Sequence, residues 1–330
     1  MTKLAVVILN YNGRSFLEKF LPSVVQYSQN HEIWVADNAS NDDSVQFLKS
    51  NYPSVKLIQI PTNQGFAGGY NTALSQIEAE YFVLLNSDVE VSENWIEPVI
   101  NLMDSDKTVA ACQPKIRSFH KPELFEYAGA AGGFIDKYGY PFCRGRIFDT
   151  CEEDLGQYDD NIEIFWATGA CMFVRANVFK ELRFDDTFFA HMEEIDLCWR
   201  IKNAGHKIVY CSKSVVYHVG GGTLQKSNPR KTFLNYRNGL ALLYKNLPAN
   251  RLFSTIFIRL VLDGISGIKL FLDGSFADTW AIIKAHFAFY AWVFRGINRN
   301  KNAKEVGQIF DSSIVWRFFV KKQKKFTDLE

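Results

Sequence analysis

The sequence predicts an α/β fold, with a doubly wound, mostly parallel sheet flanked by helices and a helical, amphipathic C-terminal extension. Within residues 1–110, short apolar runs alternate with helix-like segments. Continuous apolar, β-branched runs are typical of strands buried on both faces, and their alternation with helices favours right-handed βαβ units. Beyond residue 230 the chain changes to long apolar segments of helical character, which predict the extension.

The elements of residues 1–110 follow from these patterns in chain order. The expected strands are LAVVILN (4–10), EIWVADN (32–38), VKLIQIP (55–61) and EYFVLLNSD (80–88). The expected helices are SFLEKFLPSVVQYS (15–28), DDSVQFLKSNY (42–52) and AGGYNTALSQIEA (67–79). Ligands of doubly wound sheets bind beyond the carboxyl ends of the strands, so polar residues at these ends are the candidates for a site.

The middle of the chain is less regular. Residues 110–165 are rich in glycine and aromatic residues, which predicts loops and a hairpin over the sheet. IEIFWATGACMFVRANVF (162–179) predicts a strand, a glycine turn and a helix, in that order. GHKIVYCSKSVVYHVGGGT (205–223) predicts two short β runs that end in a glycine cluster.

Residues 246–330 are expected to form a helical region with a basic tail. Charged residues interrupt the apolar segments, so no uninterrupted apolar span of membrane-crossing length exists. Helices that lie in a membrane interface therefore fit better than spanning helices, and the lysine-rich end would be attracted to anionic lipid. The alternative is a buried helical subdomain or a dimer interface with a solvated basic tail.

Composition and cysteine usage narrow the class of protein. The chain is 47% hydrophobic and 22% charged, with a net charge of +1, which argues against a surface that binds nucleic acid throughout. The six cysteines show neither a CxxC pair nor zinc-like spacing, and the N-terminus lacks the features of a signal peptide. Reduced, buried thiols in a cytoplasmic protein are expected.

Asp88 follows an apolar strand and shares a face with Asn86, because side chains two residues apart on an extended chain point the same way. A carboxylate at this position can hold a divalent cation that bridges the phosphates of a nucleotide. A simple turn or helix cap is the alternative.

Two further strand ends carry polar groups. Asp37 ends the second strand, where it can accept a hydrogen bond from a base or a ribose, although a turn is the alternative. In TNQGFAGGYN (62–71), glycines occur at the start of an expected helix. A negatively charged group can come close to the backbone there and bind at the helix N-terminus. It lacks the G-x-G-x-x-G spacing and follows the third strand, which argues against a nicotinamide-dependent dehydrogenase.

FFAHMEEIDLCWR (188–200) places three acids behind aromatic and apolar residues, where unpaired carboxylates cost free energy. On a helix, Asp196 can pair with Arg200 four residues on, which is a structural role. Glu193 and Glu194 then remain as candidates for chemistry.

These motifs occur together in one order, with WATGACMFVRANVF (166–179) and VVYHVGGGT (215–223) as further members. In VVILNYNG, VADNASNDDS, NQGFAGGYN, LLNSDVEV and the three later motifs, the chain resembles the family 2 glycosyltransferases of the GT-A fold, close to their bacterial rhamnosyltransferase-like branch. The resemblance runs from about residue 3 to 245, with a nucleotide-binding half (1–110) and an acceptor-side half (111–245).

The resemblance implies roles for individual residues. Glu194 would be the general base, with Glu193 as the other member of the catalytic pair. Asp88 would bind the metal, Mg²⁺ or Mn²⁺, and Asn86 stands where the family often has a first Asp. His218 would serve the metal or the diphosphate, with a structural role as the alternative. The residues implied for the nucleotide are Asn10, Tyr11, Asp37, Asn63, Gly65, Asn86 and Arg237. Trp166 and Gly169 are implied for the acceptor, with core packing an equal alternative for Trp166.

The implied activity is inverting, metal-dependent transfer of a sugar from a dTDP- or UDP-sugar, such as dTDP-rhamnose, to a hydroxyl of a saccharide or lipid-linked acceptor in cell-surface polysaccharide synthesis. The implied location is the cytoplasmic face of the bacterial inner membrane. A nucleotidyltransferase is disfavoured because NYNGRSF replaces the glycine-rich basic loop expected after the first strand. A non-catalytic nucleotide-sugar-binding or membrane scaffold protein is the remaining alternative. Donor sugar, base and linkage are not determined by the sequence.

Overall fold

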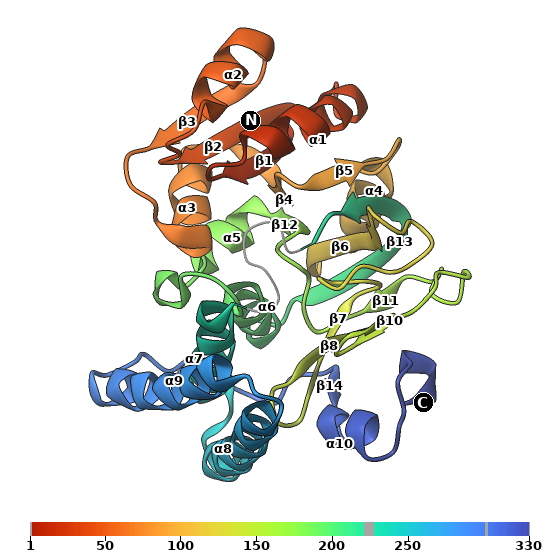
Figure 1. Ribbon diagram of the computed structural model, residues 1–330. Helices are drawn as coiled ribbons and strands as arrows, with labels where there is room; N and C mark the ends of the chain where they lie inside the picture. Colours follow the sequence, from red (N-terminus) through yellow and green to blue (C-terminus); the bar gives the residue numbers. More distant parts are fainter. Residues whose placement is uncertain (1, 221–227, 301–302, 330) are drawn as a thin grey trace.

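A computed structural model describes residues 2–220, 228–300 and 303–329 (Figure 1). Within these residues a nine-stranded sheet crosses the molecule in the order β11-β13-β6-β12-β4-β1-β2-β3, with β5 paired to β13. Its strands are β1 (Thr2–Asn10), β2 (Glu32–Asn38), β3 (Lys56–Ile60), β4 (Ala79–Asn86), β5 (Val89–Val91), β6 (Val109–Ser118), β11 (Ile162–Glu163), β12 (Cys171–Arg175) and β13 (Lys207–His218). Neighbours β4, β1, β2 and β3 run parallel, whereas β12 is antiparallel to both β4 and β6.

Helices cover both faces of this sheet, which makes it doubly wound. Alternate residues of β1 enter two different cores: Val6 packs with α1, α2 and α4, whereas Val7 packs with α3, α5, α6 and α7. The helices are α1 (Arg14–Tyr27), α2 (Ser44–Asn51), α3 (Gly65–Leu74), α4 (Glu97–Ser105), α5 (Ala176–Leu182), α6 (Glu193–Asn203) and α7 (Pro229–Asn246). The α/β class, the first four strands and the first three helices are confirmed.

The middle of the chain differs from the prediction. Across 162–179 the predicted strand and helix are present as β11 and α5, but the helix does not follow the glycine turn directly, because β12 lies between that turn and Ala176, where α5 begins. Residues 164–170 owe their apolar character to burial in a loop, in which Trp166 forms an isolated bridge with Gly133. The two β runs within 205–223 are one strand, β13, with a register shift between Cys211 and Val215. Gly221, Gly222 and Thr223 of the glycine cluster lie outside the described residues.

Residues 110–165 contain more regular structure than expected. Besides β6, they supply most of a second, five-stranded sheet in the order β10-β9-β8-β7-β14. Its strands are β7 (Gly133–Asp136), β8 (Pro141–Cys143), β9 (Arg146–Ile147), β10 (Thr150–Cys151) and β14 (Ile309–Phe310). Because β14 pairs in parallel with β7, the C-terminal segment is joined by backbone hydrogen bonds to residues far upstream.

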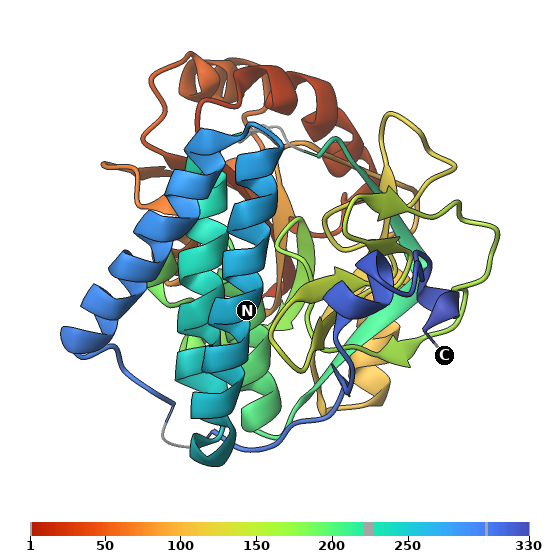
Figure 2. The ribbon, with the colours of Figure 1, turned by 60° about the horizontal axis from the view of Figure 1, so that its bottom comes forward.

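The C-terminal helices pack as a layer. Figure 2 shows α7, α8 (Ala249–Leu272) and α9 (Phe276–Phe294) side by side, with α10 (Ile314–Phe319) beyond them. Two short 3₁₀ turns, η1 (Asp186–Phe188) and η2 (Phe326–Asp328), complete the described elements. None of the helices that the structure describes combines the length and apolarity that crossing a bilayer requires. None of the six cysteines, all of which are described, forms a disulfide.

Candidate active site

The carboxyl ends of the parallel strands bring the first predicted residues together. In the sheet register, Asn10 stands beside Asp37, and its neighbour Leu9 stands beside Asn86. The Asn10 Nδ2 donates to Asp37 Oδ1 at 3.0 Å, and the backbone N–H of Ser40 donates to Asp37 Oδ2, also at 3.0 Å. Both side chains are buried, and Asn10 Oδ1 has no hydrogen-bond partner within the part of the chain that the structure describes. This edge therefore combines a fixed carboxylate with an unsatisfied acceptor, while Tyr11 beside it is 42% exposed.

Asn63 and Gly65 form the tight entry into α3. Asn63 Oδ1 accepts from the Gly65 N–H at 2.9 Å and from Asn38 Nδ2 at 3.2 Å. Gly65 has φ +71°, and a Cβ there would lie 2.6 Å from the Phe189 carbonyl oxygen. Only glycine fits this conformation and this approach. The next N–H, of Phe66, donates to the same carbonyl at 2.9 Å, so the α3 entry is joined to the segment that precedes α6.

Asp88 lies just beyond β4 and faces His218 at the end of β13. The His218 ring stands between two carboxylates, with Nε2 at 3.2 Å from Asp88 and Nδ1 at 3.0 Å from Glu126. Burial acts to lower the pKa of His218, but hydrogen bonds to Asp88 and Glu126 outweigh burial and raise that pKa to about 10. With both ring nitrogens facing acids, His218 is placed to hold Asp88 in position.

Oxygen ligands for a cation are present at this edge. Asp88 and the partly exposed Asn86 offer carboxylate and amide oxygens, which suit Mg²⁺ and Mn²⁺. Among the described residues, no group of three or more His, Cys, Asp or Glu side chains could hold a metal ion unaided. These donors fit a cation whose remaining coordination positions are filled by phosphate oxygens of the substrate, which is common for Mg²⁺.

Glu193 and Glu194 open α6 side by side in an apolar setting. Oε2 of each is buried and lacks a hydrogen-bond partner within the described chain. Burial raises the pKa of Glu194 to about 7. Burial, and then the charge of Glu194, raise the pKa of Glu193 well above its usual range. Two unsatisfied carboxylates cost free energy, which is the pattern of groups kept for a reaction rather than for stability.

The backbone before α6 adopts an uncommon conformation. Phe189, His191 and Met192 all have positive φ, between 64° and 72°. For non-glycine residues this left-handed conformation is costly and persists only where the surroundings impose it. The buried Asn238 of α7 supplies that constraint, since its Nδ2 donates to the carbonyl oxygens of Phe188, Ala190 and His191 at 3.1, 2.9 and 2.7 Å.

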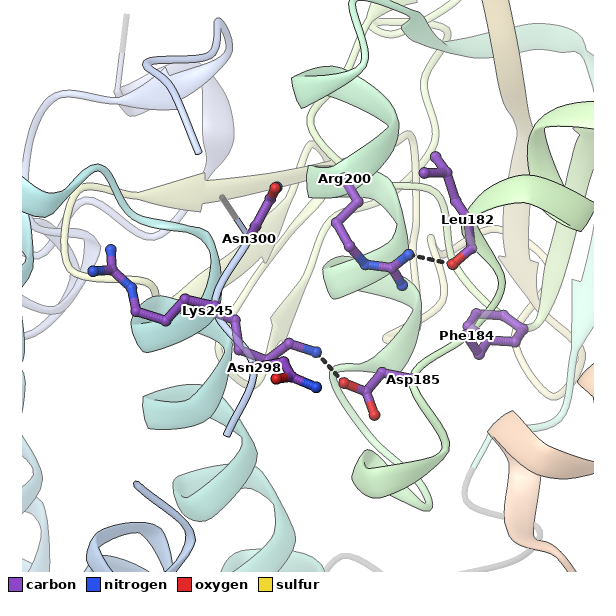
Figure 3. Close-up of a pocket in the computed structure, with 8 residues that line it drawn as sticks. Leu182, Phe184, Asp185, Arg200, Lys245, Asn298 and Asn300 are labelled. Carbon is purple, nitrogen blue, oxygen red and sulfur yellow. Dashed lines mark hydrogen bonds and ion pairs between the residues drawn. The ribbon is translucent and has the colours of Figure 1, made fainter. Parts of the chain in front are cut away.

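Behind α6, paired charges fix the helix. As predicted, Asp196 pairs with Arg200, with 2.8 Å between Oδ2 and Nε, and Asn246 donates to its other oxygen. Figure 3 shows the cavity beside this pair, about 270 Å³ in volume, where Arg200 donates to the Leu182 carbonyl and Lys245 meets Asp185. The charged side chains that line this cavity already have partners, and their contacts hold α6 in place. We therefore assign no ligand-binding site to this cavity.

The remaining predicted residues lie elsewhere. The Trp166 ring is 4% exposed, its Nε1 donates to the Phe134 carbonyl at 2.8 Å, and it packs against Gly133, which favours the core role. Gly169 leaves room for the Phe66 ring. Arg237 contacts the segment before α6 and donates to the carbonyl oxygens of Thr187 and Phe188 at 3.4 and 3.3 Å.

Glu126 and Asn238 were not predicted. Glu126 contacts His218, which lies 92 residues further along the sequence, and no pattern around Glu126 predicts this contact. Asn238 lies in NYRNG beside Arg237, and the local sequence does not indicate which carbonyl oxygens its side chain contacts.

The fold and this site define a glycosyltransferase, and the chain belongs to glycosyl transferase family 2, whose family model matches residues 5–183. Among curated relatives, the chain is 26% identical over 235 residues to the N-acetylglucosaminyl-diphospho-decaprenol L-rhamnosyltransferase of Mycobacterium tuberculosis (strain ATCC 25618 / H37Rv), covering 65% of this chain and 75% of that protein. It is 22% identical to the low-salt glycan biosynthesis hexosyltransferase Agl10 of Haloferax volcanii, covering 76% of each chain.

Solved structures share the fold. The crystal structure of GalNAc-T7 with UDP, GalNAc and Mn²⁺ superimposes with a TM-score of 0.58 at 18% identity, covering 76% of this chain and 49% of that chain. The mannosyltransferase PcManGT from Pyrobaculum calidifontis, in complex with GDP-Man and Mn²⁺, gives a TM-score of 0.52 at 14% identity, covering 89% and 76%.

Proposed function

We propose that the protein is an inverting, divalent-metal-dependent glycosyltransferase that moves a sugar from a nucleoside-diphosphate donor to a hydroxyl of a saccharide or lipid-linked acceptor. The observation that carries the proposal is the pair Glu193–Glu194 at the start of α6, in which Oε2 of each carboxylate is buried and has no hydrogen-bond partner within the described residues. The pair is connected to the strand-end residues through the backbone. The Phe66 N–H donates to the Phe189 carbonyl and so joins the α3 entry to the segment before α6.

In this reaction the acceptor oxygen attacks the anomeric carbon, the bond from that carbon to the diphosphate oxygen breaks, and configuration inverts in one displacement. Glu194 takes the acceptor proton, since a base with a pKa of about 7 is half ionised at neutral pH. Burial and the charge of Glu194 raise the pKa of Glu193 well above its usual range, which disfavours a second negative charge in the pair.

The donor side uses the strand ends. Asn10, Asp37 and the exposed ring of Tyr11 are assigned to contacts with the base and ribose. Asn63 and Gly65 are assigned to the place where the nucleotide comes close to the protein backbone. Asp88, held by His218, would bind the cation together with Asn86. When bound, that cation offsets the negative charge that develops on the leaving diphosphate.

The substrates are proposed from the relatives' names. The Mycobacterium tuberculosis relative is named for rhamnosyl transfer to a diphospho-decaprenol-linked sugar, which supports a dTDP- or UDP-sugar donor, dTDP-rhamnose among them, and a lipid-linked acceptor in cell-surface polysaccharide synthesis. The two solved structures include Mn²⁺ with UDP or GDP-Man in their titles, which supports use of a divalent cation.

The polarity of α8 supports a place at a membrane surface. Its fully buried residues include the ion pair of Arg259 and Asp263, which are 3% and 0% exposed and 2.8 Å apart, while Leu252, Ile256 and Leu260 are partly buried against the core. Tyr140 and His286 complete this internal cluster through contacts to Asp263. The outward face is apolar. Its exposed side chains are Phe253, Phe257, Val261, Ile265, Ile268, Phe271 and Leu272. A helix that buries charge and exposes large apolar side chains suits contact with lipid better than contact with water.

The neighbouring helix α9 repeats the pattern. Its exposed apolar side chains recur every three or four residues, as one helical face requires. They are Phe276, Trp280, Ile283, Phe287, Tyr290 and Phe294. The exposed Lys321, Lys322, Lys324 and Lys325 near the C-terminus add positive charge, which anionic lipid attracts. We therefore assign the protein to the periphery of the bacterial inner membrane, at its cytoplasmic face.

Calorimetry tests the donor site. UDP and dTDP should each be titrated into the wild type with and without Mn²⁺ or Mg²⁺, and into Asp88→Ala. We expect metal-dependent binding that Asp88→Ala weakens at least tenfold, whereas Glu93→Ala, a matched change of an exposed acid nearby, leaves it unchanged. Absence of binding for both nucleotides with either metal would overturn the proposal. Tight binding without transfer to any acceptor would favour the non-catalytic, nucleotide-sugar-binding alternative.

A further inference from the structure

A second cavity, about 370 Å³ in volume, lies between α7 and α9 and is distinct from the strand-end site. Pro229, Arg230 and Phe233 of α7 line it on one side, and Lys284 of α9 lines it on the other. The cavity therefore combines apolar walls with two cations. That mixture suits an anionic group attached to a hydrocarbon.

Within the described residues, neither Arg230 nor Lys284 forms an ion pair, although several exposed lysines of this chain, such as Lys3, Lys56, Lys107 and Lys207, do. Lys269 is the useful contrast, since it also lies on a helix with an exposed apolar face and yet is paired with Asp273 at 2.5 Å. Two neighbouring positive charges without a counter-charge repel each other, so an anion between them is favoured.

The cavity lies between the catalytic segment and the apolar face. The Arg230 guanidinium lies 5.5 Å from the ring centre of Phe189, in the segment that leads to Glu193 and Glu194. Lys284 borders the exposed stripe of α9, one turn after Trp280 and three residues before Phe287. A ligand held here would lie beside the exposed stripe of α9 on one side and beside Phe189, four residues before Glu193, on the other.

We propose that this cavity binds the diphosphate of a lipid-linked acceptor, with Arg230 and Lys284 contacting its phosphate oxygens and Phe233 contacting the first carbons of its chain. The inference rests on the proposed function, which it deepens by assigning the acceptor's headgroup to named residues. A guanidinium and an ammonium together neutralise most of a diphosphate's charge, and the guanidinium can bind two oxygens at once. Headgroup binding at this position would leave the attached sugar free to reach Glu194.

Farnesyl diphosphate is a suitable probe, because it carries the diphosphate and a short prenyl chain without a sugar. Calorimetry on the full chain should give binding that the double variant Arg230→Gln/Lys284→Gln weakens at least tenfold. Lys269→Gln is the matched control and should bind like the wild type. Asp88→Ala should also bind like the wild type, which separates this cavity from the donor site.

Three outcomes would overturn the assignment: no binding to the wild type, equal binding to the double variant, or binding lost in Asp88→Ala. A transfer assay separates this failure from failure of the proposed function. If the double variant raises the KM for a prenyl-diphosphate-linked acceptor at least tenfold and leaves the KM for a simple alkyl glycoside unchanged, the assignment is supported. If the wild type transfers to neither acceptor and still binds the probe as expected, the proposed function fails and the diphosphate site stands.

Discussion

At the scale of single residues, the paired glutamates of α6 carry the strongest expectation. Replacing Glu194 by Gln keeps the size of the side chain and removes the base. We expect the transfer rate to fall by about 10²–10⁴, the usual contribution of a positioned general base, while nucleotide affinity stays within about twofold. Initial rates and calorimetry on the same variant measure both quantities. Glu181→Gln, on the exposed side of α5, is the matched control. Unchanged turnover in Glu194→Gln would remove this residue from the reaction.

The pH dependence follows from the same group. Glu194 acts as a base only when ionised, and burial raises its pKa to about 7. The transfer rate kcat/KM should therefore rise with pH through about 7 and reach a plateau above it, about tenfold higher than at pH 6. A rate profile from pH 5.5 to 9 measures this. The residual rate of Glu194→Gln should lack the step, and a wild-type profile that is flat from pH 6 to 8 would contradict the assignment.

Single residues were predictable where a backbone pattern fixed their position. Asn10, Asp37 and Asn86 end parallel strands, so their meeting at one edge follows from the fold class alone. Glu126 and Asn238 act through contacts between distant segments, and nothing in the local sequence encodes such a pairing. The roles of Glu193 and Glu194 are predicted from the family resemblance alone. The structure adds that Oε2 of each is buried and has no hydrogen-bond partner among the described residues.

At the scale of elements, the connection from α7 to the segment before α6 should control the position of the paired glutamates. Asn238→Ala removes the donor that serves three carbonyl oxygens in a segment with positive φ. We expect a loss of about 1–3 kcal/mol in the free energy of unfolding, from the buried groups left without a partner. We also expect a fall in kcat with little change in the donor KM.

Urea denaturation and steady-state kinetics measure these two effects. Asn235→Ala, on the same helix, is the control and should change neither quantity greatly. A purely structural role for Asn238 would lower stability and leave kcat per folded molecule unchanged, so that result would contradict the positioning role.

Elements were predictable in proportion to their length and burial. The first four strands are continuous apolar runs because both faces of the central sheet are covered. The strands of the second sheet span two to four residues each, which is too short for an alternation of apolar and polar residues to be recognised. Their sheet depends on pairing between β7 and β14 across more than half of the chain, which no local pattern predicts.

At the scale of the whole molecule, the inverted polarity of α8 and the exposed stripe of α9 define one prediction. Phe257 is 60% and Phe287 69% exposed, and charge at these positions should oppose contact with hydrocarbon without disturbing the fold. The double variant Phe257→Glu/Phe287→Glu should lose most of its sedimentation with vesicles that contain phosphatidylglycerol. Leu155→Glu, at a 77% exposed position away from these helices, should sediment like the wild type.

The lipid dependence of the wild type separates the two contributions to membrane contact. Anionic vesicles should bind it more tightly than phosphatidylcholine vesicles, and added salt should reduce the difference, because salt screens the attraction between lysines and lipid and leaves hydrophobic insertion intact. A double variant that sediments like the wild type, but no longer self-associates in gel filtration, would instead identify the apolar face as a contact between copies of the chain. Contact with lipid would place the acceptor's hydrocarbon, the cavity of Arg230 and Lys284, and the paired glutamates in sequence from membrane to reaction centre.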